Sequence, residues 1–134
     1  MSSVTRIEQR SAQNAEIDAI LRHLTTLRGV TAAAVVDRDG LVTHIRKDFE
    51  IETDALGASV QIVFGAASKA AKHVEQNVSK IVICENDNGY ILLAPLKSDF
   101  IIALVGDRNA LLGTIRFELK ETIPELNVLF SDVK

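Results

Sequence analysis

Two aspartates and a glycine stand close together at Asp37, Asp39 and Gly40, and carboxylates at this spacing can begin a calcium-binding loop. An EF-hand loop places oxygen ligands at positions 1, 3 and 5, glycine at position 6 and glutamate at position 12. Counted from Asp37, glycine falls at position 4, Leu41 at position 5 and Asp48 at position 12. Because Asp and Gly also favour turns, and short apolar runs flank the segment, the pattern predicts a turn between two strands and no metal site.

The segment GDRNALLG, residues 106–113, has the glycines of a phosphate-binding loop. A Walker loop requires a lysine and a hydroxyl residue directly after its last glycine. Here Thr114 and Ile115 follow Gly113. The segment therefore predicts a connection between a strand and a helix, with Asn109 as the helix cap.

The histidine and cysteine side chains are spread along the sequence rather than clustered. His23, His44 and His73 fall on three separate predicted elements, whereas zinc sites usually draw on ligands at close spacing. Cys84 lies in an apolar run, where a thiol is usually buried and inert. A Cys84–His nucleophile pair would need a histidine brought close by the fold. We therefore predict no catalytic residue, no metal site and no cofactor, and expect that the protein is not itself an enzyme.

Composition limits the class of protein. The chain has 134 residues, of which 47% are hydrophobic and 4% aromatic, and a formal net charge of −3. These values predict one domain with an aliphatic core, and the mildly acidic charge disfavours nucleic acid as a partner. One cysteine fits a reducing compartment, and the longest apolar run, Phe100 to Val105, is far too short to cross a bilayer. We expect a soluble, cytoplasmic protein with no membrane partner and no small-molecule substrate.

Apolar periodicity and turn residues predict the order helix, strand, strand, helix, three strands, helix. Residues 1–11 are expected to be a flexible extension, or the loose start of the first helix, and residues 12–134 to form the domain. Gly29 is expected after the first helix with positive φ, and Pro124 is expected to kink or stop the last one. Hairpin connections imply an antiparallel sheet covered by three helices. The predicted helices span 12–28, 54–76 and 109 onward, and the strands 32–36, 41–45, 80–85, 90–96 and 100–105.

The predicted helix over 54–76 carries two distinct faces. One has the spacing of an ordinary core stripe and carries Leu56, Val60, Val63, Ala67, Ala71 and Val74. The other is rich in small residues and carries Gly57, Ala58, Gln61, Gly65, Ser68 and Lys72, with Ile62 near its margin. Two interior glycines cost about 1 kcal/mol each against alanine, which a helix tolerates where another backbone comes close. This second face is either buried within its own domain or forms the contact between two subunits.

The strand over 80–85 favours the subunit contact, because an unprotected apolar edge can pair with a copy of itself. In that arrangement two copies approach through Gly57, Gln61, Gly65 and Ser68. The side chains of Lys69, Lys72 and Gln76 then lie at the rim of a surface for a third protein.

Four segments carry a resemblance to a known family: LRGVTAAAVVDRDGLV, DALGASV, NGYILLAPL and NALLGTIRFELK. In this order and spacing the chain resembles the roadblock (dynein light-chain type) superfamily from about Ala15 to Leu126. The resemblance implies a profilin-like α+β fold. Its five-stranded antiparallel sheet has the second helix on one face and the first and last helices on the other. Pro124 departs from the uninterrupted last helix of that family.

The same resemblance implies a homodimer, or a heterodimer with another roadblock protein, that regulates Ras-like small GTPases or serves as an adaptor for cargo on dynein. The chain is most similar to the prokaryotic MglB type, which stimulates GTP hydrolysis by its partner GTPase. Carried over to this sequence, the partner-binding positions are Gln61, Gly65, Ser68, Lys69 and Lys72. The dimer-interface positions are Gly57, Ala58, Gln61, Ile62, Gly65, Ile81, Ile83 and Cys84.

Three functions remain open at this level. The first is a dimeric, non-enzymatic GTPase regulator that positions the GTPase's own groups, with an arginine supplied by Arg38 or Arg108 as the competing mechanism. The second is a structural adaptor that docks a sensor kinase, a motor or another roadblock subunit without an effect on GTP. The third is a small-molecule sensor, which would need a cavity with converging polar groups. The aliphatic composition offers few such groups.

Overall fold

The structure is a computed structural model and describes residues 3–130 of the chain. The predicted order of helices and strands is confirmed, with one short 3-10 helix added. The elements in chain order are α1 (Ser3–Thr25), β1 (Val30–Val36), β2 (Val42–Lys47), α2 (Thr53–His73), β3 (Val82–Asn86), β4 (Gly89–Pro95), η1 (Lys97–Asp99), β5 (Ile101–Asp107) and α3 (Leu112–Leu129).

The segment DRDG forms the turn that its residue types predict. One carboxylate oxygen of Asp37 accepts hydrogen bonds from the backbone N–H groups of Asp39 and Leu41, each at 2.9 Å. Gly40 has φ +85°, a backbone conformation that is unfavourable for any residue with a side chain. The aspartate therefore serves the turn between β1 and β2, and the hairpin prediction is confirmed.

The five strands form one antiparallel sheet in the order β2-β1-β5-β4-β3. β1 and β5 lie in the centre, and every residue of β1 except Thr31 is buried. Hairpin connections explain the β1–β2 and β3–β4 neighbours, whereas the β1–β5 pairing joins distant parts of the chain. The three consecutive alanines of β1, residues 32–34, leave room for helices on both faces.

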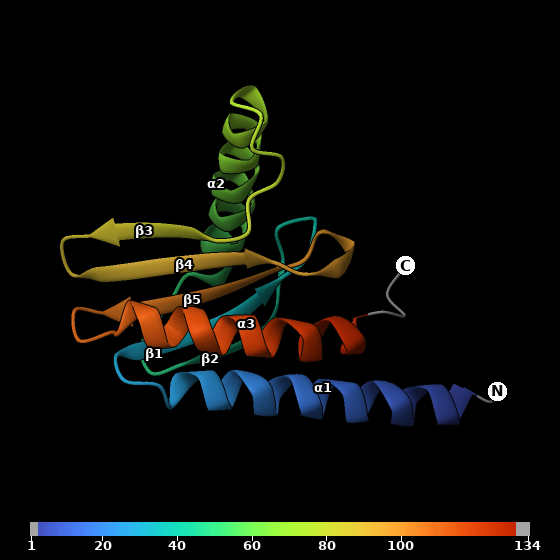
Figure 1. Cartoon of the computed structure of the whole chain (residues 1–134). Helices are drawn as coiled ribbons and strands as arrows, with labels where there is room; N and C mark the ends of the chain where they lie inside the picture. The colour runs from blue at the N-terminus through green and yellow to red at the C-terminus, as the bar shows by residue number, and fades with distance from the viewer. Residues whose placement is uncertain (1–2, 131–134) are drawn as a thin grey trace.

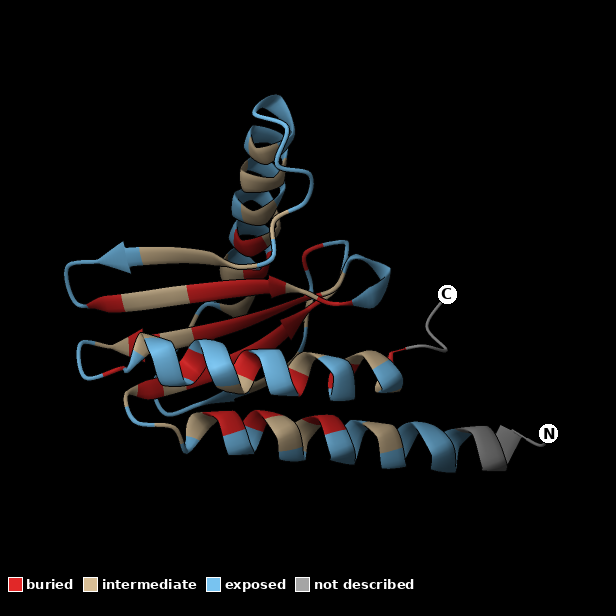
Figure 2. Cartoon of the chain, in the orientation of Figure 1, coloured by how far each residue is buried: buried red, intermediate tan, exposed pale blue. Residues whose placement is uncertain are grey.

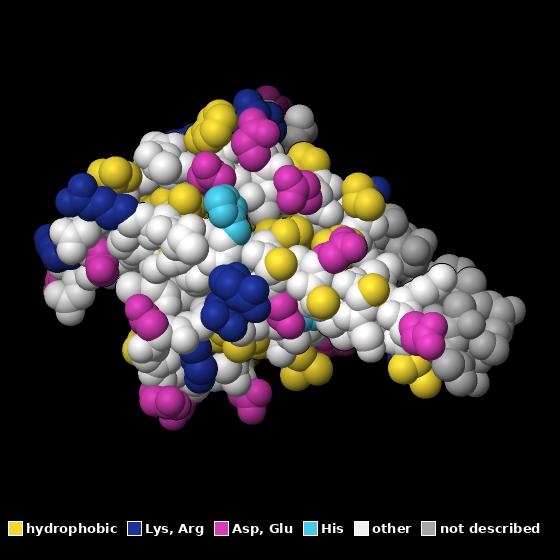
Figure 3. Space-filling model, turned by 90° about the horizontal axis from the view of Figure 1, so that it is seen from below, with side chains coloured by type: hydrophobic (Ala, Val, Ile, Leu, Met, Phe, Trp, Pro, Cys, Tyr) yellow, Lys and Arg dark blue, Asp and Glu magenta, His cyan; other side chains and the backbone are white. Residues whose placement is uncertain are grey.

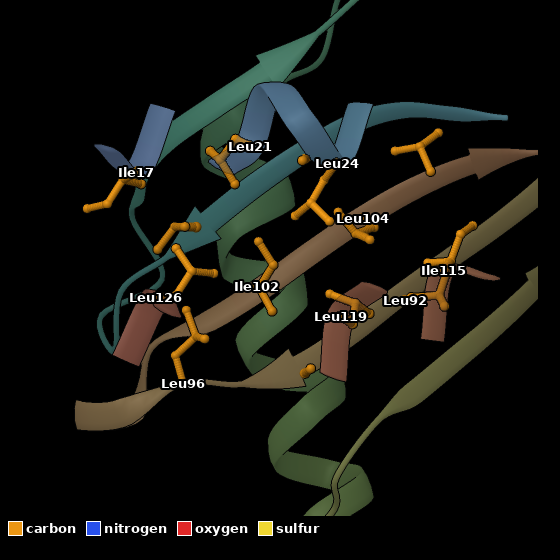
Figure 4. Packing of buried hydrophobic residues seen from close by; sticks show 14 of the residues in the cluster. Ile17, Leu21, Leu24, Leu92, Leu96, Ile102, Leu104, Ile115, Leu119 and Leu126 are labelled. Carbon is orange, nitrogen blue, oxygen red and sulfur yellow. The ribbon is translucent and has the colours of Figure 1, made fainter. Parts of the chain in front are cut away.

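The sheet separates two layers of helix (Figure 1): α1 and α3 lie side by side on one face, and α2 crosses the other. The larger core lies under α1 and α3 and is aliphatic, as composition predicts (Figure 4). Leu21 and Leu24 of α1 meet Leu104 and Ile102 of β5, and Leu119 of α3 closes the layer. The layering implied by the roadblock resemblance is therefore observed.

The core under α2 is much smaller and consists of Val36, Val60, Leu93, Ile101 and Ala103. Within α2 itself, only Gly57 and Val60 are buried. Figure 2 shows the helix changing from buried to exposed along its length, and its C-terminal half extends past the sheet edge formed by β3.

The predicted core stripe of α2 is therefore wrong beyond its first turns. Val63 is 38% exposed and Val74 is 62% exposed. The physical reason is that the helix runs out past the sheet, so side chains at the correct spacing find no surface of their own chain to cover.

Several element ends differ from the prediction; for example, α1 ends at Thr25 rather than at residue 28, and α2 ends at His73 rather than at residue 76. α1 begins at Ser3 rather than near Ala12, so part of the predicted extension is helical. The last helix begins at Leu112 with Leu111 as its N-cap, so Asn109 is not the cap. Pro124 lies inside α3 without ending it. A proline in a helix interior costs about 3 kcal/mol, which the buried Leu119 and Leu126 on either side of it offset.

Gly29 has the predicted positive φ, at +81°. However, α1 already ends at Thr25, so this glycine directly precedes β1 and does not end the helix. Among residues 3–130, every helix falls short of the length and apolar character that a membrane span requires.

Candidate protein-interaction surface

The first half of α2 is fixed by a close backbone contact. A Cβ atom at Gly57 would lie 2.1 Å from the carbonyl oxygen of Gly40 and 3.3 Å from a methyl group of Val42. The glycine is therefore explained by the approach of α2 to the β1–β2 turn of its own chain. For this reason Gly57, which the resemblance assigns to the dimer interface, is not carried into the proposed interface below.

Gln61 ties α2 to two separate loops. Its amide nitrogen donates to the carbonyl oxygen of Asp37 at 2.7 Å and to that of Asp99 at 3.1 Å. Asp99 and the preceding Ser98 both have positive φ, which is uncommon for residues with side chains. Gln61 thus holds the β4–β5 loop against the β1–β2 turn, and its amide nitrogen is engaged within the chain.

A groove of about 660 Å³ opens beside this hydrogen-bonded corner. Three predicted partner-binding residues, Gln61, Gly65 and Ser68, lie along one wall, and Arg38 lies on the rim. The wall and floor also include the apolar side chains Phe64, Val78, Pro95, Leu96 and Ile101. A Cβ atom at Gly65 would meet nothing within 4 Å among the described residues, so this flank of α2 is open.

The other two predicted partner residues, Lys69 and Lys72, are exposed on the overhanging part of α2. Ile62, predicted at the dimer interface, is 71% exposed, and Ala58 is exposed as well. The structure therefore leaves these four positions accessible on the outer side of the helix.

The opposite flank of α2, together with the residue that directly follows the helix, carries an apolar stripe that we call the alanine stripe: Val63, Ala67, Ala70 and Val74. Steps of four, three and four residues place these side chains in one row. All four are exposed or half-buried. Three of them belong to the predicted core stripe. Their spacing matches that prediction, but their side chains are not in the core.

The sheet edge below the overhang is also apolar. β3 is hydrogen-bonded to β4 alone in the described sheet. Ile81 and Ile83 are half-buried against the larger core, whereas Cys84 pairs with Ile91, whose side chain packs on the α2 face. The other edge strand, β2, ends in Arg46 and Lys47, and charged side chains of this kind protect an edge from pairing.

The remaining candidate groups do not converge. His23 lies 3.3 Å from Glu118, linking α1 to α3, while His44 lies on β2 and His73 at the end of α2. Among residues 3–130, no group of three or more His, Cys, Asp or Glu side chains is placed to hold a metal ion. The Arg108 guanidinium donates to the carbonyl oxygen of Asp87, so its position is set by the β3–β4 turn.

Charge is mixed on the side of the molecule shown in Figure 3, where acidic and basic side chains alternate and apolar ones lie singly between them. Such a surface produces no extended field of one sign and offers no extended apolar patch. On α2, by contrast, the large apolar side chains Ile62 and Val63 are exposed.

The fold of the chain is similar to several solved structures. Myxococcus xanthus MglB matches with a TM-score of 0.81 and 20% identity, covering 88% of this chain and 97% of that one. The gliding protein MglB from Thermus thermophilus matches with a TM-score of 0.79 and 17% identity, covering 91% of each chain. A Roadblock/LC7 domain from Streptomyces avermitilis matches with a TM-score of 0.78 and 16% identity, covering 85% and 97%.

No curated protein matches the sequence. The family model described as "Roadblock/LC7 domain" matches residues 16–106, from the middle of α1 to near the end of β5. Three of the four segments that carry the resemblance fall within this match, and the α3 segment lies beyond it. The match covers more than half of the chain, and the chain therefore belongs to the Roadblock/LC7 domain family.

Proposed function

We propose that the protein forms a dimer that serves as a docking platform for a Ras-like small GTPase, without being an enzyme itself. The observation that carries this proposal is the exposed C-terminal half of α2 beside the unprotected edge of β3. Family membership and the likeness of fold to MglB support it. The GTPase as partner rests on the roadblock resemblance.

In the proposed dimer, two β3 strands pair edge to edge and the alanine stripe of each α2 faces the other copy. Alanines at Ala67 and Ala70 allow two helices to approach within about 8–10 Å. Val63 and Val74 would lose their exposed area on association, which stabilises the dimer by the hydrophobic effect. Of the predicted interface residues, Ile83 and Cys84 contribute through the β3 edge, and Ile81 lies directly before this strand.

The GTPase is proposed to dock on the opposite flank, where Gly65, Ser68, Lys69 and Lys72 are accessible. Gln61 supports this surface by fixing the two loops beside it. Any acceleration of GTP hydrolysis would come from positioning the GTPase's own groups. Arg38 on the groove rim is the arginine to test as a group supplied in trans, because Arg108 is engaged within the chain.

Dimerisation is tested by light scattering of the purified chain and of Val74→Glu. A charge in the alanine stripe should convert the dimer to a monomer, because an unpaired buried charge is strongly unfavourable at an interface. Val128→Glu is the matched control, because Val128 is 70% exposed on α3, in the other helix layer. A monomeric parent protein, or an equal effect of both substitutions, would overturn the dimer.

GTPase docking is tested by capture of small GTPases loaded with GTP or GDP. Gly65→Leu should block capture while leaving the dimer intact, since a side chain there enters open space on the docking flank. Gly113→Leu is the control, because Gly113 on α3 is equally open. Absence of GTPase capture in both nucleotide states would leave the structural adaptor as the function.

A further inference from the structure

A second cleft lies on the other side of the sheet, away from α2. Its volume is about 540 Å³, within the range of small-molecule sites. It is bounded by the N-terminal half of α1, by β2 and by the end of α3. Figure 1 shows the ends of α1 and α3 reaching out together on the same side of the molecule.

One wall of the cleft is polar and comes from the N-terminal half of α1, where Arg10 and Asn14 are exposed and Gln13 is half-buried. The inward stripe of α1 is buried at Leu24, Leu21 and Ile17. Three and four residues earlier the same row carries Asn14 and Gln13, and one turn before these it carries Arg10. All three line the cleft. Amide groups offer both donors and acceptors, and a guanidinium offers a planar set of donors.

The back of the cleft is held by His44. Its Nε2 atom lies 3.0 Å from Oδ1 of Asn14, and its Nδ1 atom lies 2.9 Å from the Thr43 hydroxyl. Burial lowers the pKa of His44, and the negative charge of Asp18 opposes this only in part. The neutral ring therefore joins α1 to β2 and fixes the orientation of the Asn14 amide.

The floor of the cleft is aromatic. The ring centroids of Phe100 and Phe130 are 4.8 Å apart, with an angle of 36° between the ring planes. Phe130 is buried, whereas Phe100 is half-buried and presents part of its ring to the cleft. Flat apolar groups pack well on such surfaces.

The charge of the lining has one sign. Among the described residues that line the cleft, Arg10 is the cation and none is acidic, although the whole chain carries a net charge of −3. A guanidinium binds carboxylate and phosphate groups through paired hydrogen bonds.

We infer that this cleft binds a small amphipathic anion, with a carboxylate or phosphate group at Arg10 and a flat apolar body against Phe100 and Phe130. The amides of Gln13 and Asn14 supply further hydrogen bonds to its polar edge. The cleft lies on the α1 side of the sheet, and Phe100 is the one lining residue that it shares with the groove beside α2.

The test is a titration of the isotopically labelled full chain, followed by the NMR shifts of its backbone amides. Indole-3-acetate supplies a carboxylate on a flat ring, adenosine monophosphate supplies a phosphate, and indole-3-acetamide is the neutral counterpart of the first. At least one anion should shift the amides of Asn14, His44 and Phe100. The anion with the lower dissociation constant identifies whether the site prefers a carboxylate or a phosphate group.

Charge recognition is tested with Arg10→Gln. This variant should weaken the bound anion about tenfold and leave the affinity for indole-3-acetamide unchanged, because one charge-assisted contact is removed. Lys69→Gln on α2 removes the same charge outside the cleft and should have no effect. Absence of cleft shifts with all three probes at millimolar concentration, or equal effects of Arg10→Gln and Lys69→Gln, would overturn the assignment.

Discussion

Gly57 and Gly40 are in direct backbone contact, and this contact fixes where α2 meets the sheet: a Cβ atom at Gly57 would stand 2.1 Å from the carbonyl oxygen of Gly40. The two glycines of α2, Gly57 and Gly65, therefore have different structural roles. Gly57 allows close approach, whereas Gly65 faces open space.

Alanine substitutions should separate these two roles. Gly57→Ala should lower the free energy of unfolding by about 1–3 kcal/mol, because neither backbone can yield to the added methyl group. Gly65→Ala should raise it by up to about 1 kcal/mol, because alanine is the better helix former and meets no obstacle. The urea midpoints of unfolding of the two variants, each compared with the parent protein, measure these changes. Midpoint shifts of the same sign in both variants would contradict the backbone contact between Gly57 and Gly40.

Gln61→Leu should lower the free energy of unfolding by about 1–3 kcal/mol. The substitution removes the donor that the carbonyl oxygens of Asp37 and Asp99 share, and the Asp37 oxygen keeps only its hydrogen bond from the backbone N–H of Gly40. Limited proteolysis should show faster cleavage near η1, because the strained Ser98–Asp99 backbone loses its support.

Gln61→Glu should be at least as costly, because an ionised carboxylate faces the same two oxygens without a proton to donate. Lys69→Leu is the matched surface change on α2 and should stay within about 0.5 kcal/mol of the parent. Equal stability of Gln61→Leu and Lys69→Leu would refute the role of the amide.

Stability should decrease on acidification because of His44. Its native pKa lies below the ordinary value of 6.5, since burial disfavours the charged ring. Between these two pKa values the unfolded chain binds more protons than the folded one, so stability falls as the pH drops through this window. It levels off once the native histidine is protonated as well.

His44→Gln should reduce this pH dependence, and His73→Gln should not. Urea unfolding at about pH 8 and about pH 5 for the three proteins measures the effect. An unchanged pH dependence in His44→Gln would show that other groups produce it.

Two neighbouring residues of α3 should differ sharply in their contribution to stability. Leu119→Ala should cost about 2–5 kcal/mol, because it opens a cavity in the larger core. Phe117 is 60% exposed, and Phe117→Ala should cost less than about 0.5 kcal/mol. A comparable loss in both variants would mean that α3 packs with a different face.

Local signals in the sequence are sufficient for the order of the elements. Asp37 to Gly40 and Asn86 to Gly89 both carry turn residues between apolar runs, and both close hairpins in the structure. Such patterns depend only on residues that are adjacent in the sequence, so they can be recognised before the fold is known. The pairing of β1 with β5 depends on distant residues, and no single segment of the sequence encodes it.

The faces of α2 could not be assigned for a different reason. Spacing identifies Val63 and Val74 as members of one apolar row, but it does not say whether the surface opposite belongs to the same chain or to another. A glycine at position 57 likewise indicates a close backbone neighbour without identifying it. In the structure this neighbour is Gly40 of the β1–β2 turn. The cleft beside α1 could not be predicted, because its lining comes from four segments that lie far apart in the sequence.

The two edges of the sheet are unlike each other, and this difference limits how far strands can be added. A copy that joins through β3 consumes the one apolar border and leaves β2, with Arg46 and Lys47, at both outer ends of the enlarged sheet. Those like charges repel a further copy approaching in the same way. In the proposed dimer, growth by edge addition would therefore stop after one step, which would protect the chain from polymerising into fibres.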